Sequence, residues 1–411
     1  MPGVAKDAVG ANVTQHFGYI TSNQQYGVQY FYWLFESQNN PSTDPLVLWM
    51  TGGPGCSSEL AIFFENGPYT VQKKFLKAPE LVPNPYSWNK RANVLYVDQP
   101  GTTGFSTVQN TLGYPTDESS VAADMITFLQ GFYAQYPQYK NLPFYITGES
   151  YAGHYIPATA AAIVTANKQN PPFVIPLRAI AVGNGLIDPL LTTQSYPAFA
   201  YAAGIINSDC MQSANQLFPA CQQDIANQNY AAAFNDCNAV FSQVMQCAGN
   251  VNVYNYKTQC NPQPLCYDFT PISDYLNQRS VRDHLGVGTI SWQTCSSTVY
   301  GYLTNDFEQN FRDDIPFLIQ NNVPVTIYEG VLDIICNYFG AGATLSTLNW
   351  PGQAGFNSAS NVTWTVNGNK AGSVRSYGNL TYYNVLEAGH MVPHDQPAAA
   401  LDLLTRFLGQ K

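Results

Sequence analysis

The spacing of hydrophobic residues changes several times along the chain. Short runs rich in β-branched and aromatic residues predict buried strands, and longer runs with apolar residues three or four positions apart predict helices. In the first half the two kinds alternate, which is typical of a mostly parallel sheet covered by helices on both faces. The predicted strands are 28–36, 46–50, 93–97, 144–147, 178–182, 323–329 and 382–387, and the predicted helices are 119–133, 151–167 and 396–408.

The middle of the chain has a different pattern. From about residue 189 to 306 the sequence is rich in Gln and Asn and has helical fragments in place of strands, and it holds six of the nine cysteines between positions 210 and 266. We interpret this segment as a cysteine-rich, mainly helical insertion, or cap, which disulfides cross-link because its own hydrophobic core is small. It would divide an α/β core into a first part, 1–188, and a second part, 307–411.

Composition and charge exclude several classes of protein. The 411 residues are 45% hydrophobic and 11% charged, unlike those of a disordered chain. The net charge of −10 comes without a basic run, so we expect neither nucleic acid nor an anionic membrane as a partner. The longest apolar stretches are strand-sized, so no membrane span is predicted.

Two features indicate a protein that folds outside the cytosol. Nine cysteines without a metal-like CxxC pair predict four disulfides and one free thiol. Glycosylation sequons begin at Asn12, Asn361 and Asn379. The first residues have neither the basic nor the apolar segment of a signal peptide, so we expect a mature form whose leader was removed or replaced by Met1.

The strongest local signal surrounds Ser150. An apolar strand pattern ends in GESYAG, residues 148–153, and a helical pattern follows. Small residues two positions before and after the serine, Gly148 and Ala152, permit the sharp turn of a nucleophile elbow, which exposes the serine Oγ. Ala152 replaces the usual second glycine but keeps the small size. The same six residues also fit a tight turn with an ordinary serine at a helix start.

Two further residues stand in the order that such an elbow requires. An α/β-hydrolase has an acid after a late strand and a histidine after the last strand. Asp333 follows the strand pattern 323–329, and His390 follows the pattern 382–387. Of the five histidines, only His390 comes directly after the last predicted strand. We therefore predict an α/β-hydrolase fold with Ser150, Asp333 and His390 as its catalytic triad.

The sequence also contains candidates for an oxyanion hole. In this fold one backbone N–H comes from the residue after the nucleophile, here Tyr151, and a second comes from a loop after an early strand. The strand pattern 46–50 runs into TGGPGC, and only glycine lets the backbone approach a substrate closely. We predict Gly53 as the second donor. A purely structural turn is the alternative for these glycines.

The chain resembles the serine carboxypeptidase family. The resemblance extends from about residue 12 to the C-terminal helix and is loose only in the cysteine-rich segment. It implies an enzyme that needs no metal or other cofactor and removes C-terminal residues from peptides or proteins with a free C-terminus. It also implies a secreted, vacuolar or lysosomal location. The segments that carry it are WMTGGPGCSS, FFENGPY, NPYSWN, VDQPGTTGFS, GESYAGHYIP, GNGLIDP, VLDIICN and EAGHMVP.

The resemblance further implies a site for the substrate's C-terminal carboxylate and apolar side-chain pockets beside the scissile bond. The family usually has asparagine at the position of Thr51. The implied carboxylate-binding residues are Trp49, Thr51, Glu65 and Glu149. The implied pocket residues are Leu186, Tyr267 and Met391, which indicate a preference for apolar side chains.

A pair of neighbouring glutamates predicts an acidic pH optimum. Two carboxyl groups within hydrogen-bonding range share a proton, and an apparent pKa rises. The protonated pair of Glu65 and Glu149 would donate a hydrogen bond to a carboxylate, whereas the doubly ionised pair would repel it. Glu149 by itself also fits an acid at a helix N-terminus, where it favours the helix dipole.

The cysteines divide into two groups of expectations. The resemblance implies the disulfides Cys56–Cys295 and Cys260–Cys266. The other four cysteines of the insertion lie at nearly equal separations on two helical stretches, which favours the nested bridges Cys210–Cys247 and Cys221–Cys237 over the two other connectivities. Cys336 is then the free thiol, and we expect it near the active site.

Two other functions remain open. Relatives on this fold carry out acyl transfer or lyase chemistry, and a chain of this kind could also protect or scaffold a partner through its insertion. The triad, the glycine-rich loop and both glutamates favour peptide hydrolysis through an acyl-enzyme.

Overall fold

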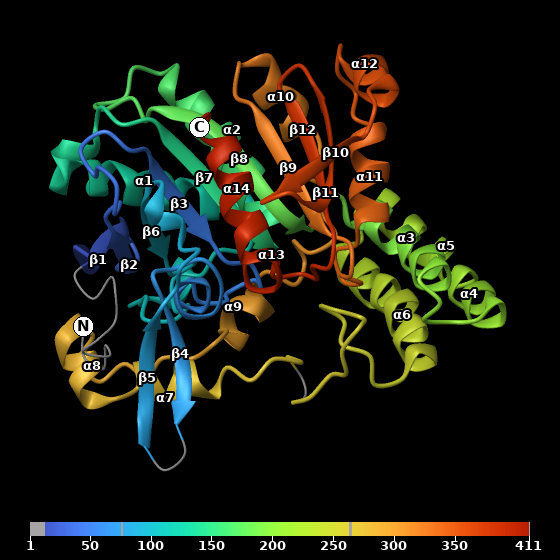
Figure 1. Ribbon diagram of the computed structural model, residues 1–411, viewed down its shortest axis with the longest axis horizontal. Coiled ribbons are helices and arrows are strands. Elements are labelled where there is room, and N and C mark those ends of the chain that lie inside the picture. The colour runs from blue at the N-terminus through green and yellow to red at the C-terminus, as the bar shows by residue number, and fades with distance from the viewer. Residues whose placement is uncertain (1–12, 75–76, 263–264, 411) are drawn as a thin grey trace.

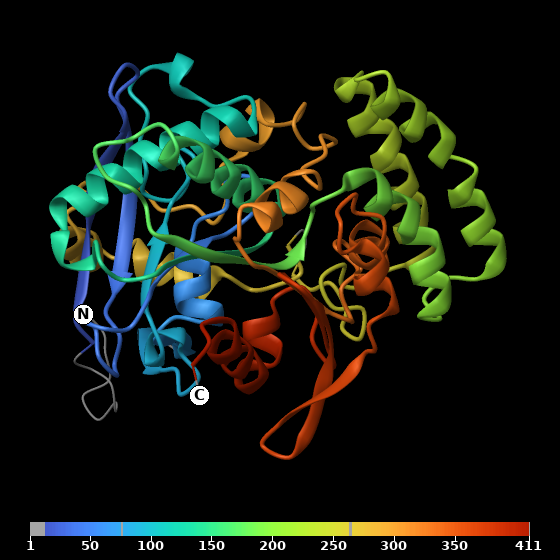
Figure 2. The same cartoon turned by 90° about the horizontal axis from the view of Figure 1, so that it is seen from above.

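The computed structural model describes residues 13–74, 77–262 and 265–410. A twisted ten-stranded sheet runs through the centre of the molecule, and helices cover both of its faces (Figures 1 and 2). The sheet strands are β1 (Gln15–Asn23), β2 (Val28–Phe35), β3 (Leu46–Met50), β6 (Asn93–Val97), β7 (Phe144–Ser150), β8 (Leu177–Gly185), β9 (Val325–Gly330), β10 (Val362–Val366), β11 (Asn369–Tyr377) and β12 (Leu380–Val385).

The sheet has a parallel centre and antiparallel edges. Its strand order is β1-β2-β6-β3-β7-β8-β9-β12-β11-β10. Strands β6, β3, β7, β8, β9 and β12 are parallel to their neighbours in this series. The edge strands pair antiparallel at both ends of the sheet. The mostly parallel α/β sheet predicted from the sequence is therefore confirmed, including all seven predicted strands.

Five strands were not predicted from the sequence. The edge strands β1, β10 and β11 are only partly buried, so they lack the apolar runs of the central strands. The other two, β4 (Tyr69–Lys74) and β5 (Lys77–Pro83), form a separate antiparallel hairpin. Backbone pairing with a neighbouring strand holds these segments, and that pairing leaves little trace in a hydrophobic pattern.

The three predicted helices are α1, α2 and α14, and their ends lie close to the predicted ones. Asp117 caps α1 by accepting a hydrogen bond from the Ser120 N–H at 2.9 Å. The helices are α1 (Glu118–Gln135), α2 (Ala152–Asn167), α3 (Pro189–Ala202), α4 (Ser208–Asn215), α5 (Phe218–Ala226), α6 (Tyr230–Ala248), α7 (Thr270–Leu276), α8 (Arg279–Leu285), α9 (Ser297–Tyr302), α10 (Asp314–Gln320), α11 (Tyr338–Ser346), α12 (Gln353–Ser358), α13 (Val392–Asp395) and α14 (Pro397–Phe407).

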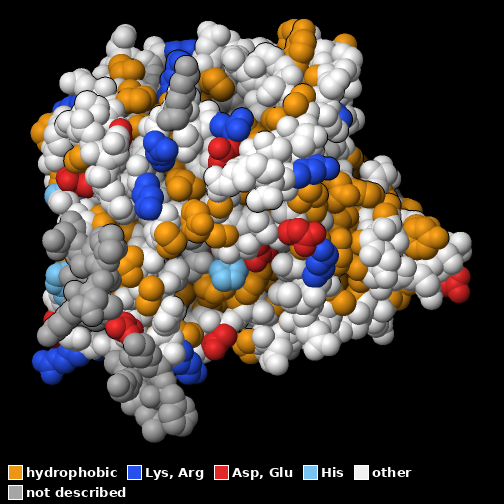
Figure 3. All heavy atoms as spheres, in the orientation of Figure 1, with side chains coloured by type: hydrophobic (Ala, Val, Ile, Leu, Met, Phe, Trp, Pro, Cys, Tyr) orange, Lys and Arg blue, Asp and Glu red, His pale blue; other side chains and the backbone are white. Residues whose placement is uncertain are grey.

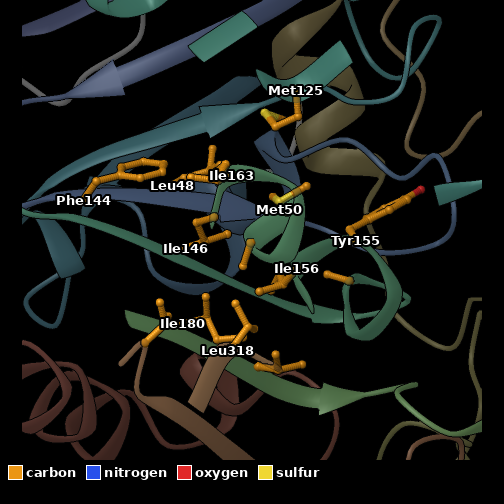
Figure 4. Close-up of a cluster of buried hydrophobic side chains, with 14 of the residues drawn as sticks. Leu48, Met50, Met125, Phe144, Ile146, Tyr155, Ile156, Ile163, Ile180 and Leu318 are labelled. Atoms are coloured by element: carbon orange, nitrogen blue, oxygen red, sulfur yellow. The ribbon is translucent and has the colours of Figure 1, made fainter. Parts of the chain in front are cut away.

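The main core lies between one face of the sheet and helices α1, α2, α10 and α11 (Figure 4). Alternate residues of each strand point to opposite faces, so Leu48 and Met50 enter this core while Trp49 packs into a second core on the other side. Burying one Leu or Ile side chain stabilises the fold by about 2 kcal/mol. Apolar burial on both faces explains why the central strands were predictable.

Residues 189–306 contribute helices but none of the named strands of the described chain. Apart from α9, these helices fall into two groups. Helices α3–α6 form a lobe on one side, and α7 and α8 lie near the β4–β5 hairpin at the other end, with α7 packed against both hairpin strands (Figure 1). The four disulfides are Cys56–Cys295, Cys210–Cys247, Cys221–Cys237 and Cys260–Cys266.

Positive charge, helix length and the glycosylation sequons can be compared with the expectations from the sequence. On the face drawn in Figure 3, Lys and Arg side chains are scattered and do not gather into a band. None of the helices in the described ranges combines the length and apolarity needed to cross a bilayer. Asn361 is exposed and Asn379 is partly exposed, while Asn12 lies outside the described residues.

Candidate active site

Ser150 stands at a sharp turn between β7 and α2. Its φ of 66° lies in the left-handed region, which non-glycine residues rarely adopt. Glycines on either side make the turn possible. A Cβ at Gly148 would lie 2.1 Å from the Met50 carbonyl oxygen, and one at Gly153 would lie 2.6 Å from the backbone of Leu186. The strained turn lifts the Ser150 side chain above the carboxyl end of the sheet, as a nucleophile elbow requires.

Asp333 and His390 meet because they follow adjacent strands. Strands β9 and β12 pair in parallel, so the loops after them lie at the same edge of the sheet. Nδ1 of His390 lies 2.7 Å from Oδ2 of Asp333, and both side chains are buried. If Nδ1–H donates to this carboxylate, Nε2 is left as the basic nitrogen of the ring. His390 and Ser150 line the same cavity.

Besides His390, three donors hold the carboxylate of Asp333. It accepts hydrogen bonds from the Asn184 side-chain amide at 3.0 Å, the Ile335 N–H at 3.1 Å and the Cys336 N–H at 3.2 Å. Such donors compensate for the loss of water around a buried charge. Asn184 had no predicted role, although it lies in the segment GNGLIDP. A buried asparagine at positive φ, here 39°, is a signal visible only in the structure.

The glycine-rich loop after β3 packs directly on the elbow. A Cβ at Gly52 would lie 2.4 Å from the backbone nitrogen of Tyr151, so only glycine fits there. Gly53 has a φ of 116° and lines a cavity together with Ser150 and Tyr151. The Cys56–Cys295 disulfide ties the loop to a distant segment. The loop therefore brings the Gly53 backbone beside the serine.

Tyr151 is anchored from behind by a buried polar cluster. Its hydroxyl donates to Oδ2 of Asp306 at 2.7 Å, and Nδ1 of His154 lies 3.2 Å from the same oxygen. All three side chains are buried. This cluster fixes the position of Tyr151, the residue directly after the serine, and so of its backbone N–H.

Two cavities meet at Ser150. The larger, about 390 Å³, is lined by Thr51, Glu149, His390 and Met391 as well as the serine. The smaller is about 230 Å³. It is lined by Leu186, Tyr196, Phe241, Glu308 and Cys336, among others. We call these the large cavity and the small cavity.

Some cavity residues were not found from the sequence. Tyr254 and Tyr300 line both cavities and come from the segment 189–306, where no motif marks them. Tyr267, an expected pocket residue, lies behind Tyr254 and stacks on it with ring centroids 5.7 Å apart.

Of the expected carboxylate-binding residues, Thr51 and Glu149 line the large cavity, and Trp49 and Glu65 lie behind them. The indole N–H of Trp49 donates to the Thr51 hydroxyl oxygen at 2.9 Å. Burial raises the pKa of Glu65 to about 7, and burial together with the charge of Glu65 raises the pKa of Glu149 well above its usual range. With both glutamates ionised, neither oxygen of Glu65 has a hydrogen-bond donor among the described residues. The pair is satisfied only when it holds a proton.

Cys336 gives the first prediction. It is the one unpaired cysteine of the described chain, it is buried, and it lines the small cavity with Ser150. Burial, and then the charge of Asp333, raises its thiol pKa well above the usual range, so it does not act as a thiolate. A mercurial on its sulfur should still block substrate binding. We expect inhibition of wild type by an organomercurial, and a Cys336→Ser variant that keeps most of its hydrolytic rate and resists the reagent. An inactive or still sensitive variant would contradict this.

Comparison with known proteins agrees with this geometry. Residues 2–410 match the sequence profile of the family described as serine carboxypeptidase. Serine carboxypeptidase-like 48 of Arabidopsis thaliana is 40% identical, over 96% of this chain and 78% of the relative. Serine carboxypeptidase S10 family member 1 of Dictyostelium discoideum is 41% identical, over 95% and 93% of the two chains.

A solved structure has the same fold. The prohormone-processing carboxypeptidase Kex1(delta)p of Saccharomyces cerevisiae superposes with a TM-score of 0.87 at 26% identity, covering 97% of this chain and 91% of that one. The family match spans nearly the whole chain, and the relatives agree with it. The chain therefore belongs to the serine carboxypeptidase family, hydrolases that remove residues from the C-terminus of peptides.

Proposed function

We propose that this carboxypeptidase works through an acyl-enzyme on Ser150, at acidic pH, with Thr51 and the Glu65–Glu149 pair holding the substrate's carboxylate. The observation that carries the proposal is that Ser150, His390, Thr51 and Glu149 all line the large cavity. A nucleophile and a carboxylate site in one cavity fit a substrate whose scissile bond is its last peptide bond.

The triad supplies the covalent chemistry. Ser150 Oγ attacks the scissile carbonyl carbon while His390 Nε2 takes its proton. The C–N bond then breaks, and the imidazolium gives the proton to the departing amine. Water attacks the resulting ester by the same route, which releases the shortened peptide and restores the serine. Asp333 keeps the histidine in the required tautomer through the 2.7 Å contact to Nδ1.

The oxyanion would be held by the backbone N–H groups of Gly53 and Tyr151. Each is fixed before substrate arrives, Gly53 by the disulfide-tied loop and Tyr151 by its hydrogen bond to Asp306. Preorganised donors of this kind stabilise the developing charge without reorganising, and removing one costs roughly 10²–10³-fold in kcat.

Thr51 can replace the family's usual asparagine. Its hydroxyl oxygen accepts from the Trp49 indole, which leaves the hydroxyl proton to donate to a carboxylate in the large cavity. Glu149 lines the same cavity and, when protonated, supplies a second donor. The buried indole of Trp49 thus orients the first donor, and Glu65 keeps the second one protonated.

The proton on the glutamate pair sets the expected pH dependence. The donor is present while the pair keeps its last proton. Glu149 holds that proton, because burial and the charge of Glu65 raise the pKa of Glu149 well above its usual range, and the donor is lost as pH rises through that raised pKa. Carboxylate binding should therefore be strongest at acidic pH and weaken toward alkaline pH.

A double substitution tests this. In wild type, kcat/KM should fall about tenfold between one and two pH units above the pKa at which the pair loses its last proton, because the protonated fraction falls tenfold per unit. The Glu65→Gln/Glu149→Gln enzyme should lose this fall and shift its optimum toward neutral pH, because an amide donates without titrating. The measurement is a pH profile of kcat/KM on a blocked dipeptide. Asp313→Asn, which removes an exposed charge, is the control. An unchanged profile in the double variant would reject the pair as the determinant.

Leu186 and Met391 support a preference for apolar side chains, since they line the small and the large cavity respectively. The four disulfides and the exposed sequon at Asn361 support a secreted, vacuolar or lysosomal location. Peptides with a free C-terminus are the proposed substrates.

The reaction class is tested by offering two substrates in parallel. We expect a blocked dipeptide to be hydrolysed, a glucose ester to persist, and a fluorophosphonate probe to label Ser150, as read by mass spectrometry. Consumption of the ester with an intact dipeptide would favour acyl transfer. Absence of labelling would favour a non-catalytic protein.

A further inference from the structure

The small cavity contains a carboxyl group that the mechanism above does not use. Glu308 lines this cavity with Ser150, Leu186 and Phe241, and only 7% of its surface is exposed. Its Oε2 is buried and has no hydrogen-bond partner within the described ranges. A buried acid without a partner costs free energy, so the cavity wall carries a polar atom that none of the described protein groups satisfies.

The surroundings of Glu308 do not neutralise it. The nearest basic residue along the chain, Arg312, instead pairs with Asp188 at 2.9 Å and donates to Thr347. The other walls of the cavity are mainly apolar or aromatic, with Leu186, Phe241 and Phe307 among them, and Thr193 and Asn238 add uncharged polar groups. Nothing in the described residues that line the cavity supplies a cation.

The position of the small cavity relative to Ser150 identifies the part of the substrate it receives. Thr51 and Glu149 place the C-terminal residue in the large cavity. The small cavity shares Ser150 with it and lies on the side of Leu186. It therefore faces the acyl side of the scissile bond, where the side chain of the penultimate residue lies.

We propose that Glu308 selects substrates with a lysine or arginine side chain at the penultimate position. This inference rests on the proposed function and assigns it a substrate class. A cationic head reaching Glu308 would supply its missing donor and pair with its charge. Charge-assisted hydrogen bonds in a site of low dielectric are among the strongest in proteins. The apolar walls would hold the methylene stem of the same side chain.

The selection should depend on pH with a defined sign. Burial raises the pKa of Glu308 to about 8, so without a cationic partner the acid is neutral below that pH. Binding a cationic side chain then requires Glu308 to lose its proton, which becomes easier as pH rises. Preference for a basic residue should increase up to pH ~8, at most about tenfold per pH unit, and then level off. At acidic pH the neutral acid tolerates apolar side chains.

Among the described residues that line the small cavity, no other group changes its charge in this pH range. Its remaining titratable side chains stay neutral in this range, because burial raises the pKa of each of them. His390 and the Glu65–Glu149 pair act on the large cavity and the reacting bond, so they affect every substrate with the same C-terminal residue alike. The neutral side chains are Tyr151, Tyr196, Tyr254, Tyr300 and Cys336.

The test compares two blocked dipeptides that share their C-terminal residue and differ in the penultimate one. One has lysine and the other norleucine, which has the same stem without the amine. In wild type the ratio of kcat/KM, lysine over norleucine, should rise at least tenfold between pH 5.5 and 7.5. In Glu308→Gln the ratio should be low and flat. Asp313→Asn, which removes a charge from the exposed part of the same segment, should behave as wild type.

The outcomes separate this inference from the proposed function. A ratio that does not change with pH in wild type, or that still rises in Glu308→Gln, overturns the role of Glu308 while hydrolysis itself stands. If neither dipeptide is cleaved by wild type, the proposed function fails, and this inference fails with it. Fluorophosphonate labelling of Ser150 and the melting temperature report whether Glu308→Gln is folded.

Discussion

Ser150→Ala should lower kcat for hydrolysis of a blocked dipeptide by roughly a millionfold, the loss that follows when a triad nucleophile is removed. Only binding and the oxyanion donors would then remain. The fold should be unchanged, because alanine is smaller and the left-handed φ of 66° strains alanine and serine alike. The measurement is single-turnover hydrolysis, with melting temperature and circular dichroism as controls for folding.

The variant should also lose fluorophosphonate labelling completely. Residual hydrolysis above a few per cent of wild type, from protein purified in a host without peptidase background, would point to a different nucleophile.

Asp333→Asn should lower kcat about 10⁴-fold. The asparagine keeps the size of the aspartate, but one of its two terminal groups is an NH2, which cannot accept a hydrogen bond. With that group facing Nδ1 of His390, the imidazole carries its proton on Nε2, which can then no longer act as the base. The surroundings add to the conflict. Asn184, Ile335 and Cys336 all donate to this carboxylate, and an amide NH2 group would face donors on one side. The measurement is kcat across pH.

The double variant Ser150→Ala/Asp333→Asn is the matched comparison for Asp333→Asn. Residues that act as a unit are not additive, so the double variant should be no slower than Ser150→Ala alone. A loss of less than tenfold in Asp333→Asn would contradict the assigned triad.

The predictable part of the fold is the part buried on both faces. Strands such as β3 and β7 are continuous apolar runs because helices cover each side of the sheet, and these runs were identified from the sequence. Strand β10 has one buried residue, Trp364, among five. It lies at the edge of the sheet and pairs with β11 on one side. A short, exposed strand of this kind has no hydrophobic pattern to detect.

The site divides in the same way. Ser150 ends one strand of the parallel sheet, and Asp333 and His390 each follow another, so strand order alone brings them to one edge. Tyr254 and Glu308 follow no sheet strand directly. Tyr254 lies between the disulfides of the 189–306 segment, and Glu308 follows α9. Their contribution to the cavities depends on how distant loops pack, and spacing along the chain does not encode it.

The most direct test of the central claim compares one blocked dipeptide as the free acid and as the C-terminal amide, at pH 5. Thr51 and the protonated glutamate pair should recognise only the carboxylate. A hydrogen bond to a charged group is worth about 1.5–3 kcal/mol, so two of them predict a free acid cleaved at least a hundredfold faster by kcat/KM. Ser150→Ala provides the background rate for both peptides. Equal rates for acid and amide would contradict recognition of the C-terminal carboxylate at this site.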